Sequence, residues 1–354
     1  MRSGFIGGGF MTDVHSRAAR AARGALAGVA SSSPESARRA ADRFGMERAY
    51  GSVDELLASD VDVVHICTPN TTHADFALAA IAAGKHVVCE KPLATSVVHA
   101  ERLVRVASDA GVTTSVPFVY RFHPMVREAR ARVAAGQVGR ILSIQGSYLQ
   151  DWLLEQGDDN WRVDTALGGP SRAFADIGSH LVDLVEFVTG DRIARLLAKT
   201  STVFEERAST ASIATEDLVA VIVETRGGAL GTLLVSQVAP GRKNALTVEI
   251  AGTSESLRFE QEQPEALWIG RRARSELMLR NTEELHPDAA RLSVIPPGHP
   301  LGYQDAFSAF VADSYAAMRG EAPEGLPTFE DGLRAVRVTD AVLASHASGT
   351  WTET

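Results

Sequence analysis

The 354-residue sequence has very little cysteine and no long hydrophobic run. Its two thiols, Cys67 and Cys89, cannot form a disulfide framework, and both lie in apolar segments typical of buried, reduced cysteine. This favours a reducing, cytoplasmic location. No apolar run approaches the roughly 18 residues of a membrane span, and the glycine-rich segment Met1–Gly7 lacks the apolar core of a signal peptide. We therefore expect neither export nor membrane insertion.

Basic residues are also too few to favour an anionic partner. The chain has 35 Lys and Arg against 44 Asp and Glu, a net charge of -9, and no basic patch offsets this. Nucleic acid and anionic lipid would meet a repulsive mean field. No internal repeat or low-complexity tract is present, and 45% apolar with 22% charged residues is typical of a globular chain. At about 150 residues per domain, the length predicts two domains.

Short apolar runs alternate with longer amphipathic stretches in the first third of the chain, which favours βαβ units and a parallel sheet. The expected strands end where glycine, proline or a polar cluster begins, and they cover residues 3–7, 25–30, 61–68, 86–90 and 112–116. Helices are expected at residues 11–23, 34–44, 73–83 and 97–110. Pro34 fits a first helical turn, and Gly45, Gly84 and Gly111 stand where helices should end. The sequence thus predicts a doubly wound parallel sheet in a domain of residues 1–120.

Longer alternating runs follow, and they are typical of an antiparallel or mixed sheet with one covered face. Strands are expected at residues 140–148, 195–205, 218–225, 229–237, 245–251 and 256–259, and helices at 124–135, 177–189, 303–319 and 329–348. The segment Glu276–Gly302, rich in proline and charge, is expected to be a loop. The fold class is therefore α/β, with a second α/β domain of residues 121–354 that contains a large open mixed or antiparallel sheet. Its last helix, 329–348, could pack on the first domain.

A glycine-rich turn joins the first expected strand to the first helix. Gly7 allows a tight turn, and Gly9 lets the backbone approach a pyrophosphate at the helix N-terminus. Thr12 stands where the dinucleotide fingerprint has its third glycine, so the helix must pack on the strand with a branched side chain there. The turn's place between a strand and a helix of the first βαβ unit predicts dinucleotide binding.

The second strand ends in Ser31, Ser32 and Ser33 rather than in the carboxylate that usually binds the ribose 2′-hydroxyl of NAD. Small hydroxyls do not repel a 2′-phosphate, and Arg38 and Arg39 on the following helix could supply positive charge. We therefore expect NADP or NAD as cofactor, with NADP slightly favoured. The serines could instead simply cap the helix that Pro34 begins.

Four motifs resemble those of the Gfo/Idh/MocA oxidoreductases over nearly the whole chain. They are Gly7-Gly8-Gly9-Phe10-Met11, Thr68-Pro69-Asn70-Thr71-Thr72-His73, Glu90-Lys91-Pro92, and Gly168-Gly169 followed by Asp176-Ile177-Gly178-Ser179-His180. The resemblance implies a Rossmann domain, an α/β domain with an open sheet, and NAD(P)-linked oxidation or reduction of a sugar, inositol or related polyol. It also implies a cis bond between Lys91 and Pro92.

The loop chemistry and the resemblance together predict the cofactor contacts. They are Gly7, Gly9, Phe10, Met11, Ser31, Ser32, Arg38, Thr68, Pro69, Asn70, His73, Glu90, Lys91, Trp161 and Arg162. For Arg162, a surface ion pair is the plainer interpretation. His15, His65, His86 and His99 are interpreted as structural.

Lys91, Asp176 and His180 are the expected catalytic residues, and with Arg121 they are the expected substrate contacts. Lys91 follows a buried parallel strand, at the edge where doubly wound sheets bind ligands. Asp176 and His180 are four residues apart and share a helical face, although an N-cap and a core imidazole are the plainer interpretations. We expect His180 to be the general acid/base, because its ordinary pKa is about 6.5, and Lys91 to stabilise the developing alkoxide.

Alternatives remain for the role of Asp183, for a metal site and for the function of the chain. Asp183 could orient His180 or cover the helix surface, and a metal site from Asp176, His180 and Asp183 is disfavoured because hydride chemistry needs no metal. The chain could be a nucleotide-binding sensor without turnover, although a sensor does not need the three catalytic residues. It could also be a dihydrodiol-type or biliverdin-type reductase. The resemblance further implies a homodimer or homotetramer through the open sheet.

Overall fold

The computed structural model describes residues 1–208 and 210–354. The chain forms two compact units, residues 1–119 with 303–336 and residues 120–302 with 337–354. The segment 303–336 therefore belongs with the first unit, and this differs from the expected division after residue 120. The cause is packing at long range, because helix α10 (Tyr303–Met318) lies against helix α1 (Phe10–Ala21).

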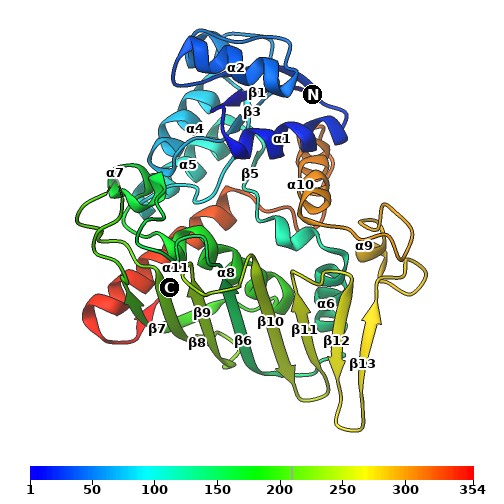
Figure 1. Ribbon diagram of the computed structural model, residues 1–354. Helices are drawn as coiled ribbons and strands as arrows, with labels where there is room; N and C mark the ends of the chain where they lie inside the picture. The colour runs from blue at the N-terminus through cyan, green and yellow to red at the C-terminus, as the bar shows by residue number, and fades with distance from the viewer. Residues whose placement is uncertain (209) are drawn as a thin grey trace. The chain divides into compact units, whose positions relative to one another are not determined.

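The first unit is built on a parallel sheet in the order β2-β1-β3-β4-β5 (Figure 1). Its strands are β1 (Arg2–Ile6), β2 (Ala25–Ala30), β3 (Val63–Ile66), β4 (His86–Cys89) and β5 (Thr114–Ser115). They are almost wholly buried, as parallel strands covered on both faces are. Each expected strand is present, although the structure shortens the third and the fifth.

Further helices of this unit are α2 (Pro34–Phe44), α3 (Val53–Leu57), the 3₁₀ turn η1 (Asn70–Thr72), α4 (His73–Ala82) and α5 (Val97–Ala110). Among them, α2 and α5 have the predicted bounds. The Ser33 hydroxyl accepts a hydrogen bond from the backbone of Ser36, and Gly45 ends α2 in the left-handed region. The serine cap of α2 is thus confirmed. Helix α3 was not predicted, because five residues are too short for a clear helical period.

The second unit contains a nine-stranded mixed sheet in the order β13-β12-β11-β10-β6-β9-β8-β7-β14 (Figure 1). The strands are β6 (Ile141–Leu149), β7 (Ile193–Ser201), β8 (Leu218–Thr225), β9 (Leu230–Ser236), β10 (Ala245–Gly252), β11 (Ser256–Glu260), β12 (Ala266–Gly270), β13 (Ser275–Leu279) and β14 (Thr352–Glu353). Strands β6 and β9 pair in parallel, and the other pairings described for this sheet are antiparallel. The predicted open mixed sheet is confirmed.

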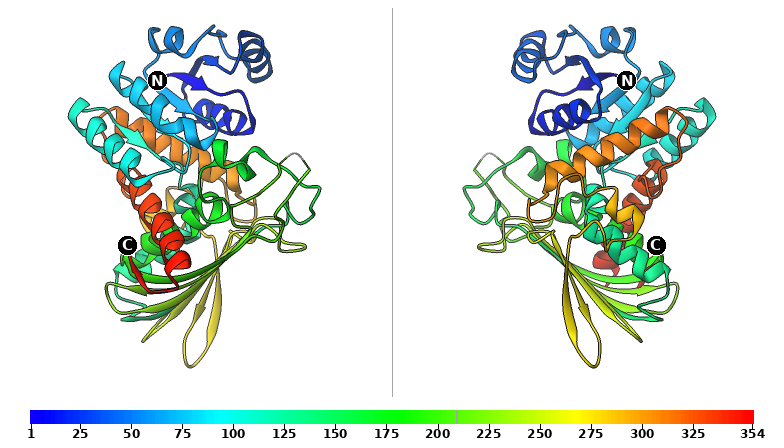
Figure 2. Two further views of the ribbon diagram at one scale, coloured as in Figure 1. Left: turned by 90° about the vertical axis from the view of Figure 1, so that its left-hand side faces the viewer. Right: turned by 90° about the vertical axis from the view of Figure 1, so that its right-hand side faces the viewer.

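Helices cover one face of this sheet (Figure 2). Helix α6 (Pro124–Ala134) lies over β11 and β12, and α8 (Ser179–Thr189) lies over β6 and β10. Helix α11 (Phe329–Ser348) belongs to both units: its first residues join the apolar core of the parallel sheet, and Ser345 near its end donates and accepts hydrogen bonds beside β7. The shorter segments are η2 (Val119–Phe122), η3 (Trp161–Val163), α7 (Thr165–Gly168), the π-helical turn η4 (Phe174–Gly178) and α9 (Pro287–Ala290).

The expected loop at Glu276–Gly302 is partly wrong. Strand β13 extends to Leu279, and α9 lies within the segment. Fully buried Arg280 donates hydrogen bonds to the carboxylate of Glu265 and to the backbone carbonyls of Ile295, Pro296 and His299. The ordering therefore comes from one side chain that gathers distant carbonyls, and a local pattern of residues does not reveal it. Among the described residues, no helix is both long and apolar enough to cross a lipid bilayer.

Candidate active site

The turn after β1 has the backbone that a dinucleotide loop requires. Gly7 has a φ of 104°, and a Cβ there would lie 2.6 Å from the carbonyl oxygen of Cys67. Gly9 precedes α1, and a Cβ there would meet no atom within 4 Å, so the helix N-terminus has room for a ligand. Thr12, in place of the third glycine, is buried and donates a hydrogen bond to the Gly7 carbonyl oxygen at 2.9 Å. The substitution thus reinforces the turn, and these residues fit a bound dinucleotide.

The serines after β2 lie beside this turn. A Cβ on Gly8 would approach the Ser31 hydroxyl to 3.3 Å, and that hydroxyl pairs with Ser36 at 3.0 Å. Arg38 donates a hydrogen bond to Glu35 at 2.7 Å, and both side chains are exposed. The turn therefore has small hydroxyls at its side, and Arg38 is held by an exposed ion pair, which contributes little to stability.

His73 ties together the two motifs that follow β3 and β4. Its Nδ1 lies 2.7 Å from the carbonyl oxygen of Pro92, and its Nε2 lies 2.9 Å from that of Thr68. Thr72 donates a hydrogen bond to the Thr68 hydroxyl at 2.7 Å, and Asn70 is buried. The predicted cofactor loop Thr68–Asn70 is thus held against the Glu90-Lys91-Pro92 turn by one buried imidazole.

Glu90 lies buried at the end of β4, directly before Lys91. Its carboxylate accepts hydrogen bonds from Nε2 of His15 at 3.0 Å and from the backbone N–H of Lys91 at 3.1 Å. Burial raises the pKa of Glu90, but the hydrogen bond and charge of His15 and the charges of Lys91 and His73 outweigh it, so this pKa is lowered. The peptide bond between Lys91 and Pro92 is cis, as the resemblance implied.

The second unit presents Asp176 on the π-helical turn η4, immediately before α8. Such turns are rare and occur often at functional sites. A Cβ on Gly178 would lie 2.6 Å from the Phe174 ring, so only glycine fits there. The Asp176 carboxylate accepts a hydrogen bond from Gln237 at 2.8 Å and lies 3.4 Å from Nε of Arg162.

His180, in the first turn of α8, lies among aromatic side chains. The centroid of its ring lies 5.1 Å from that of Tyr120, edge to face, and 6.5 Å from that of Tyr148. The two tyrosine hydroxyls are 2.5 Å apart, and Asn244 accepts from Tyr148 at 2.6 Å and donates to Tyr120 at 3.2 Å. Burial raises the pKa of Tyr120, and its hydrogen bonds to Tyr148 and Asn244 oppose this.

Arg121 and Asp183 form a buried ion pair, in which the arginine donates two hydrogen bonds. The guanidinium also stacks over the Phe187 ring at 4.9 Å. Asp183 therefore binds an arginine, which neither sequence interpretation of this residue foresaw. The expected substrate contact of Arg121 stays a prediction.

Arg162 stacks over the Trp161 ring at 4.4 Å while it pairs with Asp176. The sequence predicted a cofactor contact or a surface ion pair for this arginine, and the structure gives it a partly buried ion pair with a predicted catalytic residue. Arg162 thus places a positive charge beside the Asp176 carboxylate.

A buried ionic cluster lies where η4 begins. Arg172 and Arg207 both pair with Asp217, and the three side chains are fully buried. Neighbouring Glu216 accepts hydrogen bonds from the Ser171 hydroxyl and from the backbone N–H of Phe174 at the start of η4. This cluster fixes the segment that carries Asp176. No group of His, Cys, Asp and Glu in the described part of the chain has the arrangement of a metal site.

Sequence reasoning missed several residues beside the expected catalytic ones. Tyr148, Asn244 and Gln237 lie on or after strands and resemble ordinary sheet residues in the sequence. Their contacts form between strands far apart in the chain, and no local pattern in the sequence indicates them.

Comparison with known proteins agrees with this architecture. Residues 1–118 match the family model of the oxidoreductases with an NAD-binding Rossmann fold, and residues 126–258 match the Gfo/Idh/MocA C-terminal domain model. The chain is 31% identical to the levoglucosan dehydrogenase of Pseudarthrobacter phenanthrenivorans, over 99% of this chain and 97% of that protein. It is 37% identical to D-xylose 1-dehydrogenase (NADP+) 2 of Haloferax volcanii, over 50% of this chain and 54% of that protein.

Two solved structures have the same fold. A levoglucosan dehydrogenase in complex with NADH and levoglucosan superposes with a TM-score of 0.93 at 31% identity, covering 100% of this chain and 99% of that one. An inositol dehydrogenase homologue from Azotobacter vinelandii in complex with NAD+ gives 0.92 at 28% identity, covering 100% and 97%. A parallel nucleotide-binding sheet followed by an open mixed sheet defines a two-domain, NAD(P)-linked oxidoreductase. The chain belongs to the Gfo/Idh/MocA family.

Proposed function

We propose that this oxidoreductase transfers a hydride between NAD(P) and a secondary alcohol, or the corresponding carbonyl, of a sugar, inositol or related polyol. The observation that carries the proposal is the position of three loops at one edge of the parallel sheet. The loops begin at Gly7, Thr68 and Glu90, at the carboxyl ends of β1, β3 and β4, which are neighbours in the sheet. Doubly wound sheets bind their ligands at this edge, where the strand order reverses.

Bound NAD(P) supplies the hydride acceptor at its nicotinamide ring. In the direction of oxidation, the substrate hydroxyl loses its proton as the C–H bond breaks, and we assign that proton to the imidazole of His180. The ammonium of Lys91 stabilises the negative charge that develops on the oxygen. Asp176, held by Gln237 and Arg162, positions the substrate. These roles, and the meeting of Lys91 with His180 on one substrate, are proposals.

The names of the two similar solved proteins support a cyclic polyol as substrate, because one acts on levoglucosan and the other is an inositol dehydrogenase homologue. The test is absorbance at 340 nm with purified protein, NAD+ or NADP+, and a panel of levoglucosan, myo-inositol and common aldoses. Turnover of at least one member is expected. Tight dinucleotide binding without turnover of any sugar, polyol or flat aromatic diol would instead identify a nucleotide-binding sensor. Turnover of the aromatic diol alone would identify a dihydrodiol-type reductase.

We propose NADP as the preferred cofactor. The support is the absence of a carboxylate at Ser31–Ser33 after β2 and the presence of Arg38 in the helix that follows. The exposed pair of Arg38 with Glu35 costs little to open, so the guanidinium can turn to a 2′-phosphate. A preference for NAD of about tenfold or more in kcat/KM, roughly 1.4 kcal/mol, would contradict this proposal.

Replacing Ser31 with aspartate is expected to reverse the preference. A carboxylate beside Gly8 repels the 2′-phosphate and can accept hydrogen bonds from the ribose hydroxyls of NAD. We expect KM for NADP+ to rise about tenfold or more while KM for NAD+ stays or falls, as steady-state kinetics with both cofactors will measure. Ser31→Asn, which has the shape of aspartate without its charge, is the matched control, and equal changes for both cofactors in Ser31→Asp would show a structural effect alone.

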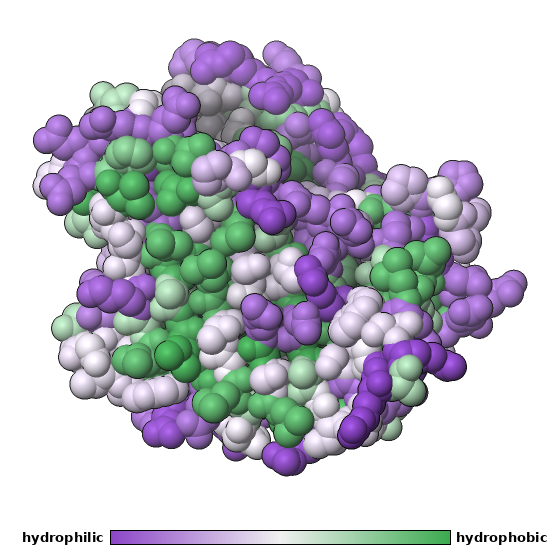
Figure 3. Space-filling view, turned by 60° about the horizontal axis from the view of Figure 1, so that its bottom comes forward, coloured by the Kyte–Doolittle hydropathy of each residue, from purple (hydrophilic) through white to green (hydrophobic). Residues whose placement is uncertain are grey.

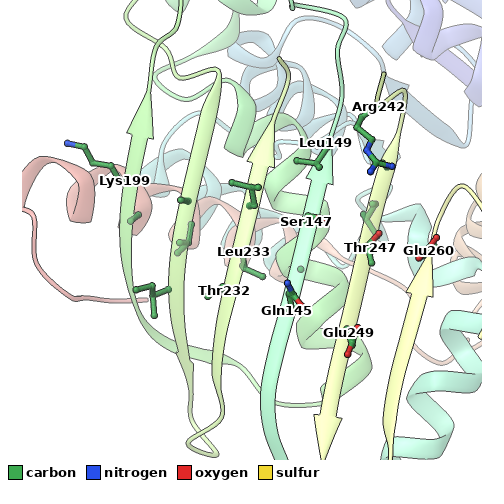
Figure 4. Close-up of a pocket in the computed structure, with 18 of the residues that line it drawn as sticks. Gln145, Ser147, Leu149, Lys199, Thr232, Leu233, Arg242, Thr247, Glu249 and Glu260 are labelled. Atoms are coloured by element: carbon green, nitrogen blue, oxygen red, sulfur yellow. The ribbon is translucent and has the colours of Figure 1, made fainter. Parts of the chain in front are cut away.

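We propose that the open face of the nine-stranded sheet joins copies of the chain into a homodimer or homotetramer. Ile222, Leu230 and Leu234 on β8 and β9 are 44%, 55% and 41% exposed. Figure 3 shows apolar side chains gathered on one face of the molecule. Gln145 and Thr232 project from neighbouring strands into a hollow of the sheet (Figure 4). A broad apolar sheet face that is exposed to solvent is typical of a protein–protein interface.

Light scattering is expected to give two or four times the chain mass of 37.7 kDa. Ile222→Glu with Leu234→Glu places two carboxylates on the apolar face and is expected to produce monomers. The matched control is Val98→Glu, which alters an exposed residue of α5 in the other unit. A monomeric wild-type protein at working concentration would exclude this interface.

We also propose a cytoplasmic location. Cys67 and Cys89 are free thiols, and burial raises the pKa of both, so neither is primed for oxidation. Fractionation of cells that express the chain tests this proposal.

A further inference from the structure

Five buried polar side chains form a line across the first unit. Ser3 comes from β1, His15 from α1, His65 from β3, Tyr315 from α10 and Glu90 from the end of β4. Sequence reasoning treated both histidines as structural. Burying a polar group without a hydrogen bond costs folding free energy. Here each of the five side chains lies within hydrogen-bonding distance of the next one in the line.

The contacts are continuous. The Ser3 hydroxyl lies 2.7 Å from that of Tyr315, which lies 2.8 Å from Nε2 of His65. Nδ1 of His65 lies 2.9 Å from Nδ1 of His15, and Nε2 of His15 lies 3.0 Å from Oε1 of Glu90. The two imidazoles are edge to face, with ring centroids 5.2 Å apart. We name these five residues the buried relay.

An ionised Glu90 beside a neutral His15 fixes the direction of every hydrogen bond in the relay. The carboxylate only accepts, so Nε2 of His15 must carry a proton, and a neutral His15 then accepts at Nδ1. His65 therefore donates from Nδ1 and accepts at Nε2 from the Tyr315 hydroxyl. Tyr315 in turn accepts from Ser3. The two histidines are neutral and have opposite tautomers, and each contact has one donor and one acceptor.

One additional proton reverses the direction of every hydrogen bond in the relay. A protonated Glu90 donates to Nε2 of His15, which then donates from Nδ1 to His65. His65 donates from Nε2 to Tyr315, and Tyr315 donates to Ser3. The ionised and protonated relays therefore differ by a single proton, and both satisfy every contact between the five residues.

We infer that the buried relay controls the charge of Glu90, directly before Lys91, and that His15 and His65 are positioning residues for the proposed reaction, on which this inference rests. Oε2 of Glu90 accepts the backbone N–H of Lys91, so the charge of the relay lies at the base of the turn that carries the proposed catalytic ammonium. When the hydrogen bonds run in the direction set by an ionised Glu90, a carboxylate stays at the base of this turn. Loss of the His15 donor leaves the buried carboxylate more easily protonated.

The surroundings support the ionised direction. The other ionisable groups around Glu90 are Cys67, Cys89, His73 and Lys91, and the charges of Lys91 and His73 lower the pKa of Glu90. Burial raises the pKa of both thiols, as does the charge of Glu90, so the thiols are neutral.

His65 and Tyr315 of the relay are neutral by the same reasoning. Burial lowers the pKa of His65 well below its usual value, and a charge on His15 would lower it further. Burial also raises the pKa of Tyr315. At neutral pH the relay therefore contains an ionised Glu90, a neutral His65 and a neutral Tyr315.

Nitrogen-15 NMR of the histidine-labelled full-length protein tests the relay without any substrate. His15→Gln and His65→Gln identify the two ring systems by difference. At neutral pH we expect His15 to carry its proton on Nε2 and His65 on Nδ1. Identical tautomers, or a protonated imidazolium at either position, would overturn the relay, and the wild-type spectrum decides this even if a variant does not fold.

The pH profile of kcat/KM tests the positioning role. In His15→Phe the burial of Glu90 is no longer opposed by this hydrogen bond, so the pKa of Glu90 rises. Because the proposed base His180 already sets the acid limb, we expect that limb to become steeper and to move to higher pH. His15→Gln retains an N–H donor and is expected to shift the limb less. The matched control is His99→Phe, an exposed histidine of α5, which should leave the profile unchanged.

The two measurements separate the possible failures. A uniform loss of kcat/KM at every pH, without movement of the acid limb, would give His15 a structural role only and overturn the positioning role. Absence of turnover on every sugar and polyol would defeat the proposed function, while the tautomers would still confirm or overturn the relay.

Discussion

Replacing Lys91 with methionine is expected to lower kcat by about 10³-fold, because the developing alkoxide loses the cation that stabilises it. His180→Asn is expected to lower kcat by about 10²- to 10⁴-fold, the range for loss of a general acid/base. Methionine keeps the length and packing of the lysine side chain, and asparagine keeps a polar side chain at the start of α8. Steady-state kinetics on a confirmed substrate measure both effects.

The control for Lys91 is Lys243→Met, which removes an exposed lysine paired with Asp151 and should leave kcat unchanged. Dinucleotide affinity, followed by nicotinamide fluorescence, verifies that the variants fold and bind cofactor. If Lys91→Met and His180→Asn each keep more than about a tenth of wild-type kcat, neither residue stabilises the transition state and the assignment is wrong. A rise in KM alone would reassign the residue to substrate binding.

Asp217→Asn is expected to destabilise the second unit by about 3–5 kcal/mol, because two fully buried guanidinium groups lose their shared counter-charge. For a unit of this size the loss lowers Tm by roughly 6–20 °C. The amide oxygen can still accept hydrogen bonds, but it carries no charge to neutralise Arg172 or Arg207. Thermal unfolding followed by circular dichroism measures the shift.

Glu321→Gln is the matched control, because Glu321 pairs with Arg319 on the surface and the pair is worth about 1 kcal/mol or less. A drop in Tm no larger than that of this control would show that the buried cluster contributes little.

The position of Asp217 also predicts an effect on catalysis, because it lies next to Glu216, which accepts a hydrogen bond from the Phe174 N–H. Asp217→Asn should lower kcat even at temperatures where it is folded, because Asp176 is then held less firmly.

Helix limits were predictable where the chain caps itself. Helices α2 and α5 have the expected bounds because Ser33 and Ser96 each accept a backbone hydrogen bond at the N-terminus, and Gly45 and Gly111 adopt the left-handed region at the C-terminus. These interactions are local, so the sequence contains all that forms them. Strands β12 and β13 were not predicted, because they are ordered by cross-strand pairing and by Arg280, whose partners lie up to 19 residues away.

The sequence by itself determined the class of the protein: glycines where only glycine fits, a lysine turn at the end of a parallel strand, and a carboxylate and an imidazole four residues apart. Each of these depends on backbone geometry within a few residues. Only the tertiary structure decided which side chains meet: Arg121 with Asp183, Tyr120 with Tyr148, and His15 with His65 and Glu90. Such pairs form because burial forces each polar group to find a partner, and the partner nearest in space is set by packing rather than by order along the chain.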